Sequence, residues 1–340
     1  MFQKMNREQL FKKAKRLKQR DDQWEVSFRR ARAWVGKGDE RPYRPWLALV
    51  VSRKGKIVRA DITDNALSAD LRFETLLQAM RRPMLGSGRA RRPQVIYLDN
   101  PDDVTALAPQ LAELGVSCEY RRALPMLKDA LYSMEKTMRK GVVIPGLLSV
   151  SGVTVPLVEH LYRLAADFYR AMPWRCLDDR HPFEIRYPAD SQPRYAVVMG
   201  NGGEVYGLAV YDKLDDLRLM FREDIPPERM INMTAWLALF FEEASAMAFD
   251  DLDAMEKYGW QAATEYAYPV FGRTTLDGTI VQPLKADIFW MEGALAAILD
   301  YLPECKRYGF IPVETTRSVK TIGGEVAVHL SAPAIDKYAV

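Results

Sequence analysis

The sequence predicts a mixed α/β protein made of two tandem copies of one module, each with the element order β-β-β-α-β-α-β-α and a helix before it. Two alignments within the chain support this prediction. Residues 45–64 match residues 193–212 without a gap, and residues 127–135 (LKDALYSME) match residues 284–292 (LKADIFWME). Such a match indicates two copies of a domain rather than an array of short repeats. The length of 340 residues also fits two domains.

The match divides the chain into four expected segments. A basic module covers residues 1–142, a linker covers residues 143–154, and an acidic module covers residues 155–309. The remaining residues, 310–340, contain β-forming types around a Gly-Gly pair. We expect this C-terminal extension to form an additional hairpin that has no counterpart in the first copy.

The first copy begins with a helix, because Leu10, Ala14 and Leu17 recur at helical spacing. An extended strand, a hairpin, and alternating helices and strands follow, with Gly115 placed to end one of the helices. The expected elements lie at residues 7–19, 24–34, 46–52, 56–62, 69–80, 94–99, 103–114, 117–121 and 124–139.

The second copy repeats this order after an amphipathic helix. Gly200–Gly203 lies between two expected strands, and its Asn-Gly pair favours a tight hairpin turn over a phosphate-binding loop. The expected elements lie at residues 155–172, 183–187, 195–199, 204–211, 215–221, 235–241, 250–258, 265–270 and 286–301.

Three strands in a meander, followed by alternating helices and strands, form the order of the ribonuclease H-like fold, which each copy resembles. Such connections predict a mixed sheet covered on both faces. Enzymes of that fold hold two metal ions on carboxylates of the first strand, the end of the fourth strand and the last helix. In the first copy the resemblance implies Asp99 and Glu135. In the second copy it implies Glu292 with Glu242 or Glu243.

One acid of this catalytic arrangement is missing. The first strand of each copy has no carboxylate at its centre, only Glu25 and Glu184 near its edge, and hard cations need several oxygen ligands. We therefore expect a non-catalytic protein without cofactor or metal. Nuclease or transposase-like phosphoryl transfer, with Mg²⁺ or Mn²⁺ on Asp99 and Glu135, stays open as the alternative.

Charge is divided unevenly between the two halves. Residues 1–142 contain 30 Lys and Arg against 17 Asp and Glu, whereas the remainder contains 18 against 28. This asymmetry predicts an anionic partner for the first half, or pairing between unlike halves. Pairing would make the protein a structural one, with a homo-oligomer held by charge-complementary modules or with an acidic protein surface as the partner.

The basic residues of the first half form two groups, one on the first helix and one in the loop after the second helix. Such groups neutralise phosphates with salt-sensitive affinity, so nucleic acid is the anionic partner that we favour. The loop contains no aromatic residue on which a single-stranded base would stack. The candidate anion-binding residues are Lys12, Lys13, Arg16, Arg81, Arg82, Arg89, Arg91 and Arg92.

Other polar residues predict no site. Asp178, Asp179 and His181 form a small cluster that we interpret as a solvated loop. Cys176 lies near His181, but two candidate ligands do not make a zinc site. No apolar run approaches the roughly 18–20 residues that span a bilayer, and the N-terminus has no apolar signal core. Three scattered cysteines fit reduced thiols. We therefore expect a cytoplasmic protein without a membrane partner.

The segment YAVVMGNGGEVYGLAVY, residues 195–211, is similar to a segment of uncharacterised bacterial proteins in a domain-of-unknown-function family. The PGLL motif at residues 145–148 and the Ala-Ala…Pro-Trp pattern at residues 165–174 also resemble that family. The resemblance covers mainly residues 140–300. It implies a bacterial protein but no activity, so no functional residue follows from it.

Overall fold

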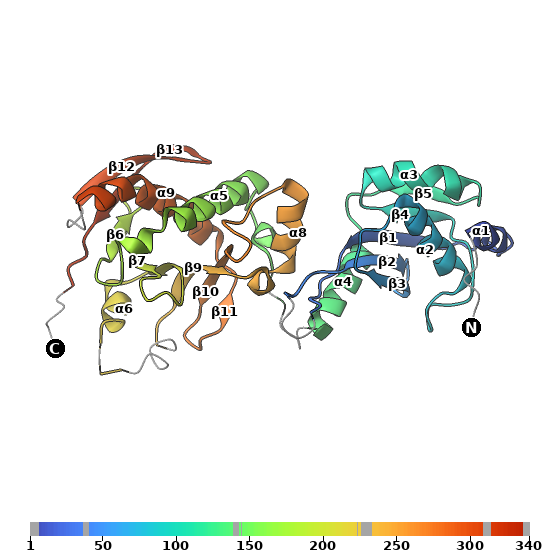
Figure 1. Ribbon diagram of the computed structural model, residues 1–340, viewed down its shortest axis with the longest axis horizontal. Coiled ribbons are helices and arrows are strands. Elements are labelled where there is room, and N and C mark those ends of the chain that lie inside the picture. Colours follow the sequence, from blue (N-terminus) through green and yellow to red (C-terminus); the bar gives the residue numbers. More distant parts are fainter. Residues whose placement is uncertain are drawn as a thin grey trace. The chain divides into compact units, whose positions relative to one another are not determined.

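The computed structural model describes residues 7–36, 41–138, 143, 145–222, 224–225, 233–308 and 314–335. These residues form eight α-helices and two β-sheets, so the fold is mixed α/β as the sequence predicts. The chain divides into two compact units, unit 1 (Met1–Val143) and unit 2 (Ile144–Val340), each with its own sheet (Figure 1).

Unit 1 contains a five-stranded sheet in the order β3-β2-β1-β4-β5. β2 runs antiparallel to β1 and β3, whereas β4 is parallel to β1 and β5 is parallel to β4. The elements in chain order are α1 (Arg7–Lys15), β1 (Gln23–Arg30), β2 (Trp46–Ser52), β3 (Ile57–Thr63), α2 (Ala69–Arg81), β4 (Val95–Leu98), α3 (Pro101–Ala112), β5 (Ser117–Tyr120) and α4 (Pro125–Met138).

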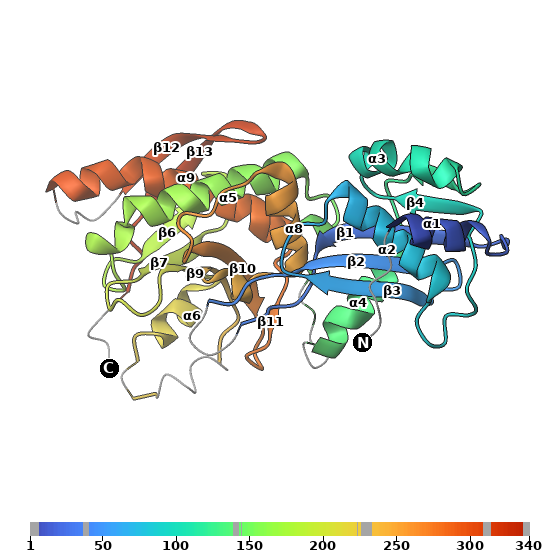
Figure 2. The same cartoon turned by 45° about the vertical axis from the view of Figure 1, so that its right-hand side comes forward.

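Helices cover both faces of this sheet (Figure 2). Side chains alternate between the two faces along each strand. Trp24 of β1 therefore packs in one core with Phe73 of α2, together with residues of α1 and α3. Leu49 of β2 packs in the other core with Leu127 of α4.

Side-chain caps fix where two of these helices begin. The Ser68 hydroxyl accepts a hydrogen bond from the backbone N–H of Leu71 at the start of α2 (3.4 Å). Before α3, the Asn100 side chain accepts from the N–H of Asp102 (2.9 Å), and Pro101 occupies the first turn. Ser and Asn are favoured before the first turn because their side chains accept from a backbone N–H that has no partner within the helix. Pro is favoured in the first turn because it has no such N–H. The cap at Asn100 leaves Asp99 directly after the end of β4.

Unit 2 contains an eight-stranded sheet that is antiparallel throughout, in the order β11-β10-β9-β8-β7-β6-β13-β12. Its elements in chain order are η1 (Leu147–Ser149), α5 (Val155–Ala171), η2 (Pro173–Arg175), β6 (Phe183–Arg186), β7 (Arg194–Met199), β8 (Gly207–Tyr211), α6 (Leu214–Leu219), β9 (Trp236–Glu242), η3 (Ala244–Ala246), α8 (Phe249–Tyr258), β10 (Tyr268–Thr274), β11 (Ile280–Val281), α9 (Lys285–Tyr308), β12 (Glu314–Thr321) and β13 (Gly324–Ser331).

Two long helices, α5 and α9, lie side by side against this sheet (Figure 1). Tyr162 of α5 stacks on Phe271 of β10, with 6.0 Å between ring centroids. Phe168, two turns further along α5, stacks on Phe241 of β9 at 6.4 Å. Aromatic pairs at these separations add to the stability that burial alone provides. These two pairs therefore form part of the core of unit 2.

The sequence predicts a mixed sheet in the second copy, and this prediction is wrong. The hairpins match, since β2–β3 and β7–β8 both lie in the aligned segments. However, β4 adds to β1 in unit 1, whereas β9 adds to β8 in unit 2. The C-terminal hairpin explains the difference in part. β6 is the first strand of its meander, as β1 is in unit 1, and β13 pairs with the edge of β6 that corresponds to the edge of β1 where β4 pairs.

Candidate functional site

The two basic groups of unit 1 lie next to each other. The backbone N–H of Arg20 donates to the carbonyl of Arg92 (2.9 Å), and the N–H of Arg92 donates to the carbonyl of Lys18 (3.1 Å). The segment that follows α1 therefore runs beside the end of the loop that follows α2. Residues about 70 positions apart in the sequence thus meet just before the first residues of β1 and β4.

Arg91 and Arg92, both expected to bind an anion, make internal bonds instead. The Arg91 Nε donates to Asp22 Oδ2 (2.7 Å), and its guanidinium lies 5.4 Å from the centre of the Trp24 ring. The Arg92 Nε donates to the carbonyl of Leu17 (3.0 Å), and its Nη1 donates to another backbone carbonyl. Both side chains are half-buried. They hold the two basic segments together.

The other six candidates form what we call the basic surface: Lys12, Lys13, Arg16, Arg81, Arg82 and Arg89. All except Arg81 are exposed, and Lys12 is paired with Glu8 on the same helix (2.5 Å). Exposed cations of this kind are available to phosphates at little desolvation cost.

Arg81 is the partly buried member of the basic surface. Its Nη1 atom is buried, and no hydrogen-bond partner for it occurs in the part of the chain that the structure describes. Burial, and then the neighbouring charge of Arg82, lower the pKa of Arg81. A buried donor without a partner is costly, and an anion bound beside Arg81 and Arg82 would reduce the repulsion between their charges.

Asp99 and Glu135 lie at the other end of the parallel strands. Asp99 follows β4 and accepts a hydrogen bond from the Ser27 hydroxyl of β1 (2.9 Å). Glu135 of α4 is almost fully buried and forms an ion pair with Arg32 Nη1 (3.1 Å). The position beside Asp99 on the first strand thus carries a hydroxyl, and an arginine already neutralises Glu135.

The remaining carboxylates of unit 1 are also engaged in structure. Glu25 of β1 accepts from the N–H of Leu127 at the start of α4 (2.8 Å), and burial raises the pKa of Glu25. Asp103 of α3 is buried and paired with Arg72. Among the described residues, no three His, Cys, Asp or Glu side chains are grouped so that they could hold a metal ion.

The second copy of the LKxxxxxME motif has a similar arrangement. Glu292 of α9 is fully buried, bonds the His160 ring of α5, and accepts from the N–H of Ile322 in the β12–β13 turn (2.7 Å). Glu242 and Glu243, the two acids that the resemblance offers as alternatives beside Glu292, are both exposed at the end of β9. In each unit the motif glutamate is therefore a buried side chain held by a basic partner.

Asp178, Asp179 and His181 lie in a loop, as the sequence predicts, and Asp179 is exposed, but Asp178 is buried and forms hydrogen bonds that stabilise the loop. Asp178 is buried, lies 2.8 Å from His181 Nδ1, and accepts hydrogen bonds from Arg180 (2.6 Å) and Asn201 (3.2 Å). Asn201 belongs to the β7–β8 connection, where the N–H of Gly203 donates to the carbonyl of Gly200 (3.1 Å). The Gly-rich segment is thus a turn, as the sequence predicts, and Asp178 anchors it.

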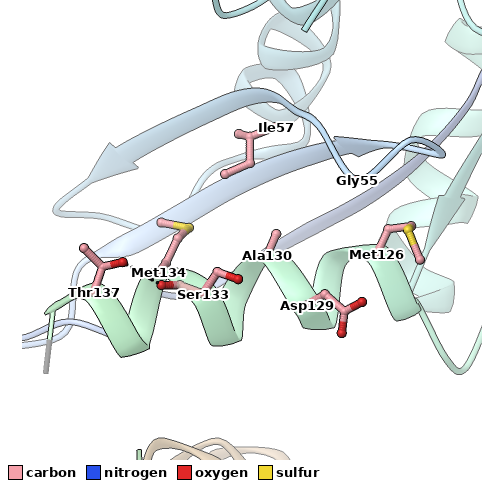
Figure 3. Close-up of a pocket in the computed structure, with 8 residues that line it drawn as sticks. All are labelled: Gly55, Ile57, Met126, Asp129, Ala130, Ser133, Met134 and Thr137. Atoms are coloured by element: carbon pink, nitrogen blue, oxygen red, sulfur yellow. Dashed lines mark hydrogen bonds between the residues drawn. The ribbon is translucent and has the colours of Figure 1, made fainter. Parts of the chain in front are cut away.

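Two features had no signal in the sequence. A groove of about 330 Å³ lies between α4 and the β2–β3 hairpin, where Ile57 and Met134 extend toward each other (Figure 3). It contains no basic residue and is separate from the basic surface. In unit 2, Asp251 is buried, and it accepts from Tyr162 and from the N–H of Leu147 (2.8 Å). Both depend on contacts between residues distant in the sequence.

Comparison with known families gives two matches, each to a domain of unknown function. Residues 10–135 are similar to the family described as DUF6930, and residues 159–317 are similar to the family described as DUF7309. The matches agree with the resemblance to uncharacterised proteins, and the two halves of the chain are similar to different family models. No curated protein matches the chain. None of the described helices is both long and apolar enough to cross a membrane.

Proposed function

We propose that unit 1 is a non-catalytic binding module that engages the phosphates of nucleic acid through the basic surface. The observation that carries the proposal is the backbone pairing of residues 18–20 with Arg92, which joins two basic groups into one surface. Its exposed cations extend from α1 to the loop after α2 instead of converging on one point. A small anion needs two or three donors, whereas a surface of this extent fits a polyanion.

Salt dependence tests this proposal. Affinity for a labelled DNA duplex should fall steeply between about 50 and 200 mM salt, because each neutralised phosphate releases counterions. The triple substitution of Arg16, Arg82 and Arg89 by Gln should reduce the slope of log K against log salt by about 0.9 for each lost phosphate contact.

A matched control is available in the same unit. Arg122, Lys128 and Lys136 are exposed on α4 and the loop before it, and their replacement by Gln removes the same charge. We expect this control to leave the slope nearly unchanged. Absence of binding at low salt, or an equal loss in the control, would overturn the proposal.

We further infer that unit 1 has a ribonuclease H-like fold. The order β3-β2-β1-β4-β5, with β2 antiparallel to the other four strands, supports this. Metal-dependent phosphoryl transfer through Asp99 and Glu135 has less support. Glu135 is neutralised by Arg32, and the basic surface lies at the other end of β1 from Asp99. A phosphate bound there would lie away from these acids.

Pairing between the basic surface and acidic residues of a second copy is the competing use of the same charges. It predicts that the molar mass falls as salt rises, because ions screen such contacts. Light scattering on the full chain at the two salt concentrations separates the two ideas. A dimer that dissociates with salt, together with no binding of nucleic acid, would favour pairing.

A further inference from the structure

A fully exposed leucine projects from the loop that carries Arg82 and Arg89 of the basic surface. Leu85 lies between Arg82 and Arg89, and its neighbour Met84 is also exposed. Single exposed apolar residues are common and need no explanation by themselves. Leu85 differs because its backbone is held in a hydrogen-bonded turn and because Arg82 and Arg89 lie three and four residues from it in the sequence.

A hydrogen-bonded turn presents this leucine. The N–H of Ser87 donates to the carbonyl of Met84 (3.1 Å), and the Ser87 hydroxyl donates to the same carbonyl (2.7 Å). Leu85 and Gly86 are the two central residues, and Gly86 has a φ of +84°. A positive φ at the third position defines a type II turn, which favours glycine there. Leu85 thus occupies the outer corner of the turn.

The turn is also attached to the sheet. The N–H of Met84 donates to the carbonyl of Val58 in β3 (2.8 Å), and the Ser87 side chain is buried. Because the loop is held at both ends of the turn, little backbone entropy remains to be lost when Leu85 contacts a partner. An apolar side chain kept in water in this way is suited to insertion into an apolar layer.

We propose that Leu85 is a wedge that inserts between stacked base pairs when the basic surface binds a nucleic acid duplex. This inference rests on the proposed function and adds to it the class of nucleic acid, a duplex that is unstacked at one step. Apolar wedges, leucine among them, unstack base steps in proteins that bind duplexes through backbone contacts. Arg82 and Arg89 would hold the phosphates on either side of the opened step.

The loop chemistry favours a duplex over a single strand. It has no aromatic ring on which an unpaired base would stack, and stacking contributes most of the base affinity in single-strand binders. The gap between two base pairs needs only an aliphatic side chain of limited size. Insertion of one leucine into an anionic lipid surface is the competing outcome, and the experiment distinguishes it.

The experiment measures duplex binding and base unstacking together in the full chain. A short DNA duplex that contains 2-aminopurine becomes more fluorescent when the modified base loses its stacking. With the natural protein we expect this increase on binding. Leu85→Ala should abolish the increase and weaken binding about tenfold, the effect of losing one buried leucine contact, with an unchanged salt slope.

Two further variants serve as controls. Leu85→Met keeps a flexible apolar side chain and should keep both the fluorescence increase and the affinity. Leu276→Ala removes another exposed leucine, in the β10–β11 turn of unit 2, and should change neither.

Each outcome has a separate meaning. Failure of the natural protein to bind the duplex at low salt would overturn the proposed function. Salt-sensitive binding without any fluorescence increase would overturn the wedge and leave the proposed function intact. Leu85-dependent binding to vesicles of anionic phospholipid, with duplex binding unaffected by Leu85→Ala, would also overturn the wedge and assign the leucine to a lipid surface.

Discussion

Both units contain the same three-stranded meander, but the fourth strand is added to opposite edges of it. In unit 1, β4 lies parallel to β1, and β3 is an edge strand. In unit 2, β9 lies antiparallel to β8, and the tail strand β13 lies on the β6 edge. The comparison teaches that the aligned sequences specify the hairpin, while residues outside the alignment decide what packs beside it.

A glycine in β8 illustrates the difference between the two strand edges. Gly207 of β8 aligns in sequence with Arg59 of β3, 148 residues earlier, although the strands pair Gly207 with Met199 and Arg59 with Val50, a register difference of one residue. A Cβ at Gly207 would lie 2.0 Å from the carbonyl oxygen of Leu239 in β9, so a side chain is excluded where β9 approaches. Arg59 lies on the edge strand of its sheet and pairs with Asp61 (2.6 Å). The glycine therefore marks the strand edge that is covered in unit 2.

The largest loss of stability should come from removing the glutamate that occupies the same position of the LKxxxxxME motif in each unit, Glu135 or Glu292. Glu135→Ala leaves the Arg32 guanidinium largely buried without its carboxylate, and should cost unit 1 about 4 kcal/mol. Glu135→Gln keeps an acceptor and should restore much of the loss. Hydrogen exchange of the full chain measures the effect in α4, with peptides of unit 2 as the internal control.

The same test addresses the catalytic alternative. Unchanged protection of α4 in Glu135→Ala would contradict a structural role and make Glu135 available as a metal ligand.

Glu292→Ala should loosen α9 and the β12–β13 turn in unit 2 only, because Glu292 bonds His160 and the N–H of Ile322. A response of both units to either substitution would contradict the division between them.

A smaller effect is expected at the aligned strand edge. Gly207→Ala forces β8 and β9 apart and should destabilise unit 2 by about 3 kcal/mol, as overpacking against backbone does. Arg59→Ala should cost less than about 1 kcal/mol, because its ion pair with Asp61 is partly exposed. Hydrogen exchange of β8 and β9 should increase in the first variant, while β3 in the second should stay protected. Equal effects would mean that both edges are covered alike.

Local features of the fold were predictable from the sequence. The two hairpins, the turn at Gly200–Gly203 and the C-terminal hairpin all follow from turn residues between β-forming runs, and the structure confirms them. Element ends were less accurate. The first helix, expected to reach residue 19, ends at Lys15, because the chain then turns to run beside Arg92.

Strand pairing and the site depend on contacts that local pattern does not encode. Nothing near β9 in the sequence indicates that it pairs with β8 rather than β6, since the tail strand that competes for β6 is about 90 residues away. The basic residues were identifiable by composition. The sequence does not indicate that Arg91 forms an internal ion pair, because its partner Asp22 lies 69 residues earlier.

The smallest effect concerns a buried carboxylate that supports a connection in unit 2. Burial raises the pKa of Asp251 from 3.8 to about 7. The folded state therefore binds a proton that the unfolded state lacks, and stability falls as pH rises from about 4 through about 7. Between about pH 6 and 8 the loss should be about 1.4 kcal/mol.

Asp251→Asn should remove this part of the pH dependence, because the amide has no charge to bury and still accepts from the N–H of Leu147. Exposed Asp215 provides the control, since Asp215→Asn should leave the pH profile as it is. Hydrogen exchange at Leu147–Ser149 and along α8 at several pH values, corrected for the intrinsic rate, measures the effect. In unit 1, Glu25 likewise bonds a backbone N–H, that of Leu127, and its pKa is raised by burial. A loss of protection with rising pH that persists in Asp251→Asn would place the titrating group elsewhere in unit 2.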